Sequence, residues 1–333
     1  MLMRISNAGG LLGAMLAAAV GFGFPAAQAQ QSYPVRPVTL VVPFAAGGAT
    51  DALARLIAVA MSRDLGQQII IENVSGGGGT VGSTRVARST PDGYTLLLGH
   101  AGTHAASVGF YKKLPYDPVD DYEAIGEVGD APQILIVSKT LPVRTLKEFA
   151  EYVKANQQKL SFGTAGVGSA SYLGGVMLNV ILGTNTTPVS YRGLGSAYTD
   201  LLAGRIDYMV DVSTSVLPQV QAGTVTPIAV MRSIRITALP DLPASPESGI
   251  PGLDFSVWNV LLAPRGTPSP VIDRLNSALL AALRDETVRA RLSELGIEPP
   301  DDSRMTPDGA RAHMKAEIRK WLPIVKSLGV TLD

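Results

Sequence analysis

Two glycine-rich turns carry the residues of this chain best suited to binding an anion. Each turn follows a short apolar run and precedes an amphipathic stretch: the first lies in Val38–Asp51 and the second in Leu160–Ser171. A helix N-terminus presents unpaired backbone N–H groups and a partial positive charge, and glycine lets a ligand approach them closely. Because the two turns are about 120 residues apart, they predict a cleft whose opposing sides both hold negative groups.

In the first turn, glycine leaves room for the ligand and the following amides are the expected donors. The predicted contacts are Ala46, Gly47, Gly48, Ala49 and Thr50. Thr50 and Asp51 also fit the helix N-cap position, which remains an alternative role for both. We expect Asp51 to be structural, because a carboxylate aimed at an anion would repel it.

The second turn combines small hydroxyl side chains with glycine at an expected helix start, which suits donation to the other end of a ligand. The predicted contacts are Thr164, Ala165, Gly168, Ser169, Ala170 and Ser171. An ordinary helix cap with tight packing is the alternative for this segment.

The elements that must position these turns follow an alternating pattern. Apolar runs with strand character alternate with stretches whose apolar residues recur at helical spacing, such as Leu53, Leu56, Ile57, Ala60 and Met61. This order predicts an α/β fold with mostly parallel strands and flanking helices. The expected strands are Val38–Pro43, Gln68–Asn73, Tyr94–Gly99, Ile134–Ser138, Leu160–Gly163, Thr187–Tyr191, Tyr208–Asp211, Pro227–Met231 and Val257–Ala263.

The length of 333 residues favours two lobes, since single hydrophobic cores stop growing near about 250–300 residues. Gly126–Pro132 and Leu239–Pro251 read as crossings between them. We therefore predict a discontinuous first lobe of residues 30–130 and 240–333, and a second lobe of residues 131–239.

The first 29 residues read as a cleavable export signal. Arg4 supplies the positive end, Leu11–Phe24 is apolar, and Ala27–Ala29 fits a small-residue cleavage site. The remaining chain has one fewer basic than acidic side chain, which argues against nucleic-acid binding. The absence of cysteine excludes disulfides, thiol catalysis and a lipoprotein anchor. We expect a soluble periplasmic protein that is monomeric.

Several segments resemble the receptors of the tripartite tricarboxylate transporter family, the Bug-type periplasmic solute-binding proteins. The similarity runs in order through the whole chain after the signal. It is carried by VVPFAAGGATD at Val41–Asp51, IENVSGGGGTVG at Ile71–Gly82, PDGYTLLLG at Pro91–Gly99, YKKLPYDP at Tyr111–Pro118, FGTAGVGS at Phe162–Ser169 and LLAPRGTP at Leu261–Pro268.

This resemblance implies a two-lobed type II periplasmic-binding-protein fold, the Venus flytrap. It implies capture of a small organic carboxylate, such as a di- or tricarboxylate, amino acid or aromatic acid, and its delivery to membrane transporter subunits. It also places Gly102 and Thr103 near the cleft mouth, and matches Asp211 to a residue that reaches the cleft in many relatives. Relatives often carry histidine at Tyr172 and lysine at Arg192.

Three further positions have open roles. Asp211 is suited to accepting a hydrogen bond from a ligand amine or hydroxyl, and a capping role is the alternative. For the aromatic side chains we favour a place in the cleft for Phe44 and a place in the core for Trp258.

Other motifs do not support a catalytic or cofactor site. Gly77–Gly82 formally matches a dinucleotide fingerprint, but no acidic residue ends the next strand. His100 and His104 have helical spacing, yet the third histidine, His313, is distant, so we expect no metal and no cofactor. No nucleophile elbow occurs. Two alternatives remain open: a sensor module for a membrane histidine kinase, and a periplasmic hydrolase of carboxylate esters.

Overall fold

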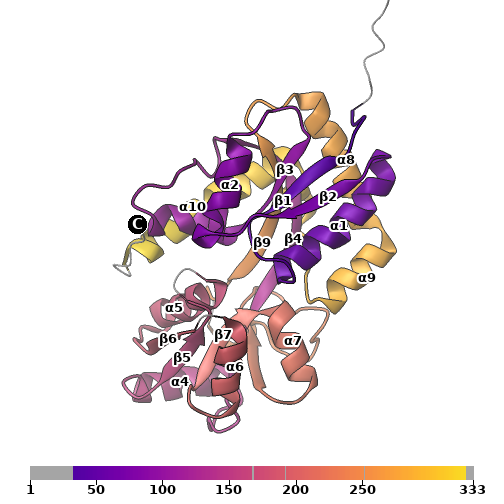
Figure 1. The fold of residues 1–333 in the computed structure, drawn as a ribbon. Coiled ribbons are helices and arrows are strands. Elements are labelled where there is room, and N and C mark those ends of the chain that lie inside the picture. Colours follow the sequence, from indigo (N-terminus) through magenta and orange to yellow (C-terminus); the bar gives the residue numbers. More distant parts are fainter. Residues whose placement is uncertain (1–32, 167–168, 192, 251, 328–333) are drawn as a thin grey trace, which may run out of the picture. The chain divides into compact units, whose positions relative to one another are not determined.

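One long strand, β4 (Tyr122–Val137), takes part in two sheets. Its first part, up to Pro132, pairs antiparallel with β9 (Ser256–Pro264), and its second part pairs antiparallel with β7 (Tyr208–Val212) and β8 (Thr226–Val230). The computed structural model describes residues 33–166, 169–191, 193–250 and 252–327. Figure 1 shows β4 and β9 running from one group of helices to the other.

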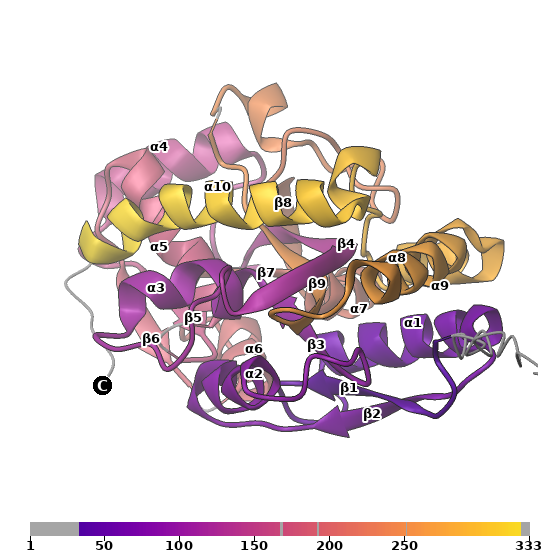
Figure 2. The ribbon, with the colours of Figure 1, turned by 90° about the horizontal axis from the view of Figure 1, so that it is seen from above.

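The first sheet has the strand order β2-β1-β3-β9-β4. Here β1 (Val38–Val42) pairs in parallel with β2 (Ile69–Asn73) and β3 (Thr95–His100), and β3 pairs antiparallel with β9. Successive side chains of a strand point to opposite faces. Accordingly Leu96 and Leu98 join one buried cluster with α1 (Ala49–Leu65) and α8 (Ser269–Arg284), whereas Leu97 joins another with α10 (Pro307–Ser327). Figure 2 shows helices on both faces of this sheet.

The second sheet has the order β8-β4-β7-β5-β6, with β5 (Ser161–Thr164) parallel to β6 (Thr187–Ser190) and to β7. Helices α4 (Leu146–Asn156) and α5 (Ala170–Leu182) bury side chains with one face of this sheet, and α6 (Leu194–Leu202) and α7 (Ser213–Gln221) with the other. The remaining helices are α2 (Thr80–Ala87), α3 (Ser107–Phe110) and α9 (Glu286–Glu294).

The strand order confirms the α/β class and corrects one detail of it. Each of the nine expected strands is present in or near its predicted range. Parallel pairing holds within β1–β3 and within β5–β7, but β4, β8 and β9 pair antiparallel, so both sheets are mixed.

The segment Gly126–Pro132, expected from the sequence as a crossing between the lobes, is part of β4. Its register against β9 shifts between Ala124 and Gly126 and again between Glu127 and Gly129. A Cβ on Gly126 would lie 2.5 Å from the Met305 carbonyl oxygen, and one on Gly129 would lie 2.7 Å from Ile297 Cγ2. These glycines therefore permit bulges and close packing inside a strand that takes part in both sheets.

Three predictions concern residues outside the described ranges: the export signal at residues 1–29, the ligand contact Gly168 and the side chain of Arg192. Within the described ranges, no helix combines the length and the apolar character that a membrane crossing requires.

Candidate ligand-binding site

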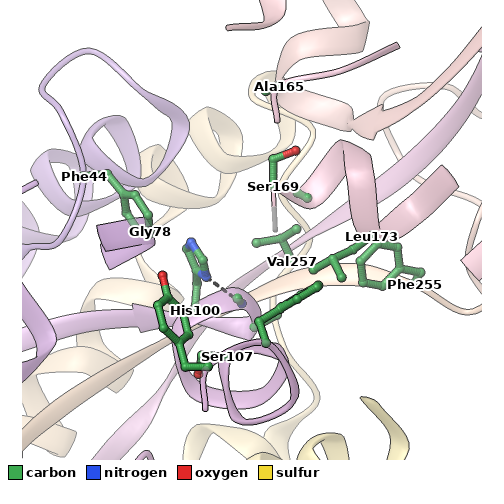
Figure 3. Close-up of a pocket in the computed structure, with 14 residues that line it drawn as sticks. Phe44, Gly78, His100, Ser107, Ala165, Ser169, Leu173, Phe255 and Val257 are labelled. Atoms are coloured by element: carbon green, nitrogen blue, oxygen red, sulfur yellow. Dashed lines mark hydrogen bonds between the residues drawn. The ribbon is translucent and has the colours of Figure 1, made fainter. Parts of the chain in front are cut away.

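A cavity of about 370 Å³ lies where the two sheets meet, and residues of both sides line it (Figure 3). The size is within the range of about 300–1,000 Å³ found for small-molecule sites. Its lining residues are Phe44, Gly78, His100, Ala101, Gly102, Ser107, Phe110, Tyr111, Ala165, Ser169, Ala170, Leu173, Phe255 and Val257.

His100, the last residue of β3, is the most polar side chain of this lining. Its Nδ1 accepts hydrogen bonds from the backbone N–H of Gly102 at 2.8 Å and of Thr103 at 3.4 Å. A neutral ring that accepts at Nδ1 carries its proton on Nε2. No described residue accepts from Nε2, so this N–H is available to a ligand in the cavity.

Stacking and burial fix the His100 ring in this role. It stacks on Phe44 with the ring centroids 4.5 Å apart and an interplanar angle of 7°. Burial lowers the pKa of His100 to about 4, because desolvation disfavours the imidazolium form. His100 is therefore a neutral donor across the physiological range.

The opposite side of the cavity is the start of α5. Ser169 is the N-cap, and its Oγ accepts from the backbone N–H of Tyr172 at 3.2 Å. The Oγ of Ser171 accepts from the backbone N–H of Ala165 at 3.0 Å, which closes the turn. The first amides of the helix, at Ala170 and Ser171, have no acceptor among the described residues, as expected at a helix N-terminus.

Phe110, Leu173, Phe255 and Val257 form much of the remaining wall, which is therefore largely apolar. Among the described lining residues none carries a charge at neutral pH, since His100 is held neutral. The cavity thus offers an imidazole N–H and a helix N-terminus as its donors, with no cationic side chain. Such a site suits the carboxylate of a small organic acid, which backbone N–H groups and helix N-termini bind without a counter-ion.

Comparison with known proteins identifies the family. The family described as tripartite tricarboxylate transporter family receptor matches residues 53–330. That span is most of the chain.

The chain belongs to this receptor family.

Three solved structures are similar over nearly the whole chain. The periplasmic binding protein BugD is 42% identical, with a TM-score of 0.77 over 90% of this chain and 100% of that one. MatC from Rhodopseudomonas palustris with bound malate is 41% identical, with a TM-score of 0.77 over 88% and 100%. A second R. palustris protein, with adipate, is 34% identical, with a TM-score of 0.80 over 90% and 100%. The two-lobed periplasmic-binding-protein fold is therefore that of this receptor.

The structure brings five of the predicted contacts into the cavity lining: Phe44, Gly102, Ala165, Ser169 and Ala170. The other residues of the first turn lie outside this lining. Ala46, Gly47, Gly48 and Ala49 are exposed to solvent, and Thr50 is half-buried. The first lobe instead reaches the cavity through His100–Gly102, the end of β3 and the turn after it.

Asp51 has the structural role expected for it. It is 3% exposed, and its Oδ2 accepts from the backbone N–H of Gly47 at 2.9 Å and from Arg55 Nε at 3.0 Å, while Oδ1 accepts from Asn73 Nδ2 at 3.0 Å. Burial alone would raise the pKa of Asp51, but the hydrogen bonds from Arg55, Gly47 and Asn73 outweigh it and lower the pKa to about 2. Asp51 therefore stays ionised and ties the glycine turn to β2.

Three more predicted contacts lie behind the cavity wall. Thr103 is 1% exposed, and its Oγ1 donates to the carbonyl oxygen of His100. Thr164 is fully buried, and its Oγ1 accepts from the backbone N–H of Gly166. Ser171 is 2% exposed and bonded to Ala165. All three hold the turns that line the cavity.

Asp211 lies on β7 and is 1% exposed. Its Oδ2 accepts from the Tyr198 hydroxyl at 3.1 Å and its Oδ1 from the backbone N–H of Val212 at 2.8 Å. It is not among the lining residues of the cavity. Trp258, expected in the core, is 1% exposed and donates from Nε1 to Glu317, so that prediction is confirmed.

Sequence reasoning missed His100, Tyr111 and Phe255. His100 was weighed only as a metal ligand, although it directly precedes Gly102 and Thr103 at the end of a strand. This position could have identified His100 as a residue of the binding site. The sequence offers no such signal for Tyr111. Its hydroxyl reaches the cavity rim by donating to the carbonyl oxygen of Gly77, which is 34 residues away. Among the described residues no three His, Asp or Glu side chains form a metal-binding group.

Gly102→Ala and Gly48→Ala form a matched pair that tests which turn of the first lobe contacts the ligand. A Cβ on Gly102 would lie 2.5 Å from His100 Cε1, whereas one on Gly48 would meet only the Ala45 carbonyl oxygen at 3.6 Å. We expect Gly102→Ala to displace the imidazole and to weaken binding of an organic acid about tenfold, the effect of one charge-assisted hydrogen bond. Gly48→Ala should leave calorimetric affinity unchanged, and the reverse ranking would place the ligand at the first glycine turn.

The raised pKa of Asp211 predicts a pH-dependent stability. Burial raises this pKa to about 7 from 3.8, despite the hydrogen bonds from Val212 and Tyr198. Between these values the folded state binds more protons than the unfolded state, so this group makes the free energy of unfolding fall as pH rises from about 4 to 7. We expect Asp211→Asn to remove that slope, as urea unfolding at several pH values would show. Parallel pH profiles for the two proteins would contradict the assignment.

Proposed function

We propose that this protein is a periplasmic solute-binding receptor that captures a small organic acid in the cavity and delivers it to a tripartite tricarboxylate-type membrane transporter. The observation that carries the proposal is the pairing, across one cavity, of the His100 Nε2–H with the N-terminus of α5. One donor belongs to the first lobe and the other to the second. An acid that contacts both therefore favours the closed arrangement of the lobes.

The ligand carboxylate is held by neutral donors. Hydrogen bonds from neutral N–H groups to a carboxylate are stronger than neutral–neutral ones, and an enclosed apolar wall strengthens them further. The relatives that bind malate and adipate support an aliphatic carboxylic acid as the ligand class. We extend the contact set to the remaining predicted residues of the second turn and to Asp211 in the closed state.

Binding without turnover is the role that the geometry favours over hydrolysis. A general base needs a free acceptor within reach of a nucleophile. The Nδ1 of His100 is occupied by the Gly102 amide, and the Oγ of Ser107 donates to the Thr103 carbonyl oxygen. The described part of the lining therefore contains no nucleophile and base in contact.

The proposed organisation follows from the sequence and the family. The lobes are residues 30–130 with 240–333, and residues 131–239. The segment 1–29 directs export and is cleaved, and the mature receptor works as a monomer that hands its ligand to transporter subunits.

His100→Asn tests the donor role of the imidazole. Asparagine can still accept from the Gly102 amide through its side-chain oxygen but has no group that reaches the place of Nε2. We expect acid affinity to fall about tenfold or more, since hydrogen bonds to charged groups contribute about 1.5–3 kcal/mol. Because burial lowers the pKa of His100 to about 4, the wild-type affinity should not change between pH 6 and 8 through this residue. Unchanged affinity in His100→Asn would remove the imidazole from the site.

A thermal-shift screen of organic acids, followed by uptake measurements, tests the function as a whole. A ligand at about 100 times its dissociation constant should stabilise the protein by about 2.7 kcal/mol. Deletion of the gene should then abolish uptake of that acid, and complementation with the His100→Asn variant should restore it only partly. Full uptake in the deletion strain, with loss of an acid-induced transcriptional response, would favour the histidine-kinase sensor instead.

A further inference from the structure

A second cavity lies on the other face of strand β9. Phe255 and Val257 line the acid-binding cavity, while Asp254, Ser256 and Trp258 line a separate cavity of about 500 Å³. This alternation is what opposite faces of one strand produce. The second cavity is also lined by Asp130 of β4, by Arg232 after β8, and by Arg304 and residues of α10.

The charged groups of this cavity are buried and only partly satisfied. Arg232 is 9% exposed and Asp130 is 3% exposed. The Arg232 guanidinium donates no hydrogen bond to any described residue, and its nearest anionic atom is Asp130 Oδ2 at 4.0 Å. That distance is too long for a hydrogen bond. Arg232 Nη1, Asp130 Oδ1 and Arg304 Nε are all buried without a partner.

Such groups need an occupant of the cavity. A buried donor or acceptor without a partner costs about 1–3 kcal/mol, and more when it is charged. Here unsatisfied donors and an unsatisfied acceptor lie next to one another, since Arg232 Nη2 faces Asp130 Oδ2 while Nη1 and Oδ1 are both left open. The occupant must therefore present an acceptor and a donor at once.

The charge of the cavity limits the occupant further. The carboxylates of Asp130 and Glu127 face the guanidinium groups of Arg232 and Arg304, with ion-pair distances between 3.3 and 4.0 Å. His313 contacts Glu127 as well. Glu317 is satisfied separately, because it accepts from Trp258, Trp321 and Lys320. The two arginines balance the carboxylates of Asp130 and Glu127, and the lining also holds Asp254, Asp301 and Lys320, so no excess of positive charge remains to hold a plain anion.

We propose that this cavity is a second binding site, for a small zwitterion that carries its ammonium and carboxylate groups on one carbon, as an α-amino acid does. The ligand carboxylate accepts from the guanidinium groups of Arg232 and Arg304, and the ammonium donates to the carboxylate of Asp130. A short spacing between the two charges is required because Arg232 and Asp130 are themselves neighbours. This site is independent of the proposed transport function.

Four small probes test the site on the purified wild-type protein by saturation-transfer NMR and calorimetry: glycine, 4-aminobutyrate, propionate and ethylammonium. We expect glycine to bind and 4-aminobutyrate to bind at least about tenfold more weakly, because only glycine presents both charges at one carbon. Propionate and ethylammonium should not bind at Arg232. No binding of glycine up to about 10 mM would leave ordered water as the occupant and overturn the proposal.

Two sets of variants assign any bound glycine to one of the two cavities. Arg232→Gln and Asp130→Asn should each weaken glycine binding about tenfold or more and leave binding of the organic acid unchanged. Leu173→Trp, which fills the acid-binding cavity, should weaken the acid and leave glycine unaffected. Arg291→Gln, which removes an exposed arginine paired with Glu294, is the matched control. Glycine binding that survives Arg232→Gln and Asp130→Asn but not Leu173→Trp would place glycine in the acid-binding cavity and overturn the second site.

Discussion

The pairing of β4 with β9 is the constraint on which both cavities depend. These two strands pass between the sheets, and their ladder runs from Tyr122–Pro264 to Pro132–Ser256. The residues at its end, Phe255 to Trp258, face the cavity beside His100 and the second cavity in alternation. Since side chains of a strand alternate strictly, a slip of one residue would exchange the two linings. The bulges at Gly126 and Gly129 fall in the same ladder, so they adjust the register that this alternation requires.

The proposed recognition of an anion uses neutral groups, and the surrounding structure explains how they stay neutral and oriented. The imidazole of His100 stacks on Phe44 and is bound at Nδ1 by the Gly102 amide, which directs the proton to Nε2. On the other side, Ser169 and Ser171 satisfy the amides of Tyr172 and Ala165 and leave the first amides of α5 open. A site of this kind offers no buried positive charge that would need a partner when it is empty. That property suits a receptor that must alternate between loaded and unloaded states.

The two glycine turns contribute differently to the lining of the cavity, and the sequence does not predict this difference. Both turns have glycine, small residues and a following helix. In the structure the second turn lines the cavity directly, whereas only Phe44 of the first does so. The reason is the Asp51 network: its bonds to Gly47, Arg55 and Asn73 hold the first turn against β2. Asn73 lies 22 residues from Asp51 along the chain, and no local sequence pattern predicts that contact. His100 takes the place of the first turn because β3 ends beside β9.

The sequence by itself determined the α/β class, the nine strands and the family, because apolar periodicity and turn chemistry are local properties of the chain. It also identified the second glycine turn, where cap, hydroxyls and glycine are neighbours in sequence. Only the tertiary structure decided which amides share a hollow, which tautomer His100 adopts, and that Arg232 and Asp130 meet behind β9. These outcomes depend on strand order and on burial, and both arise from contacts between residues that are far apart along the chain.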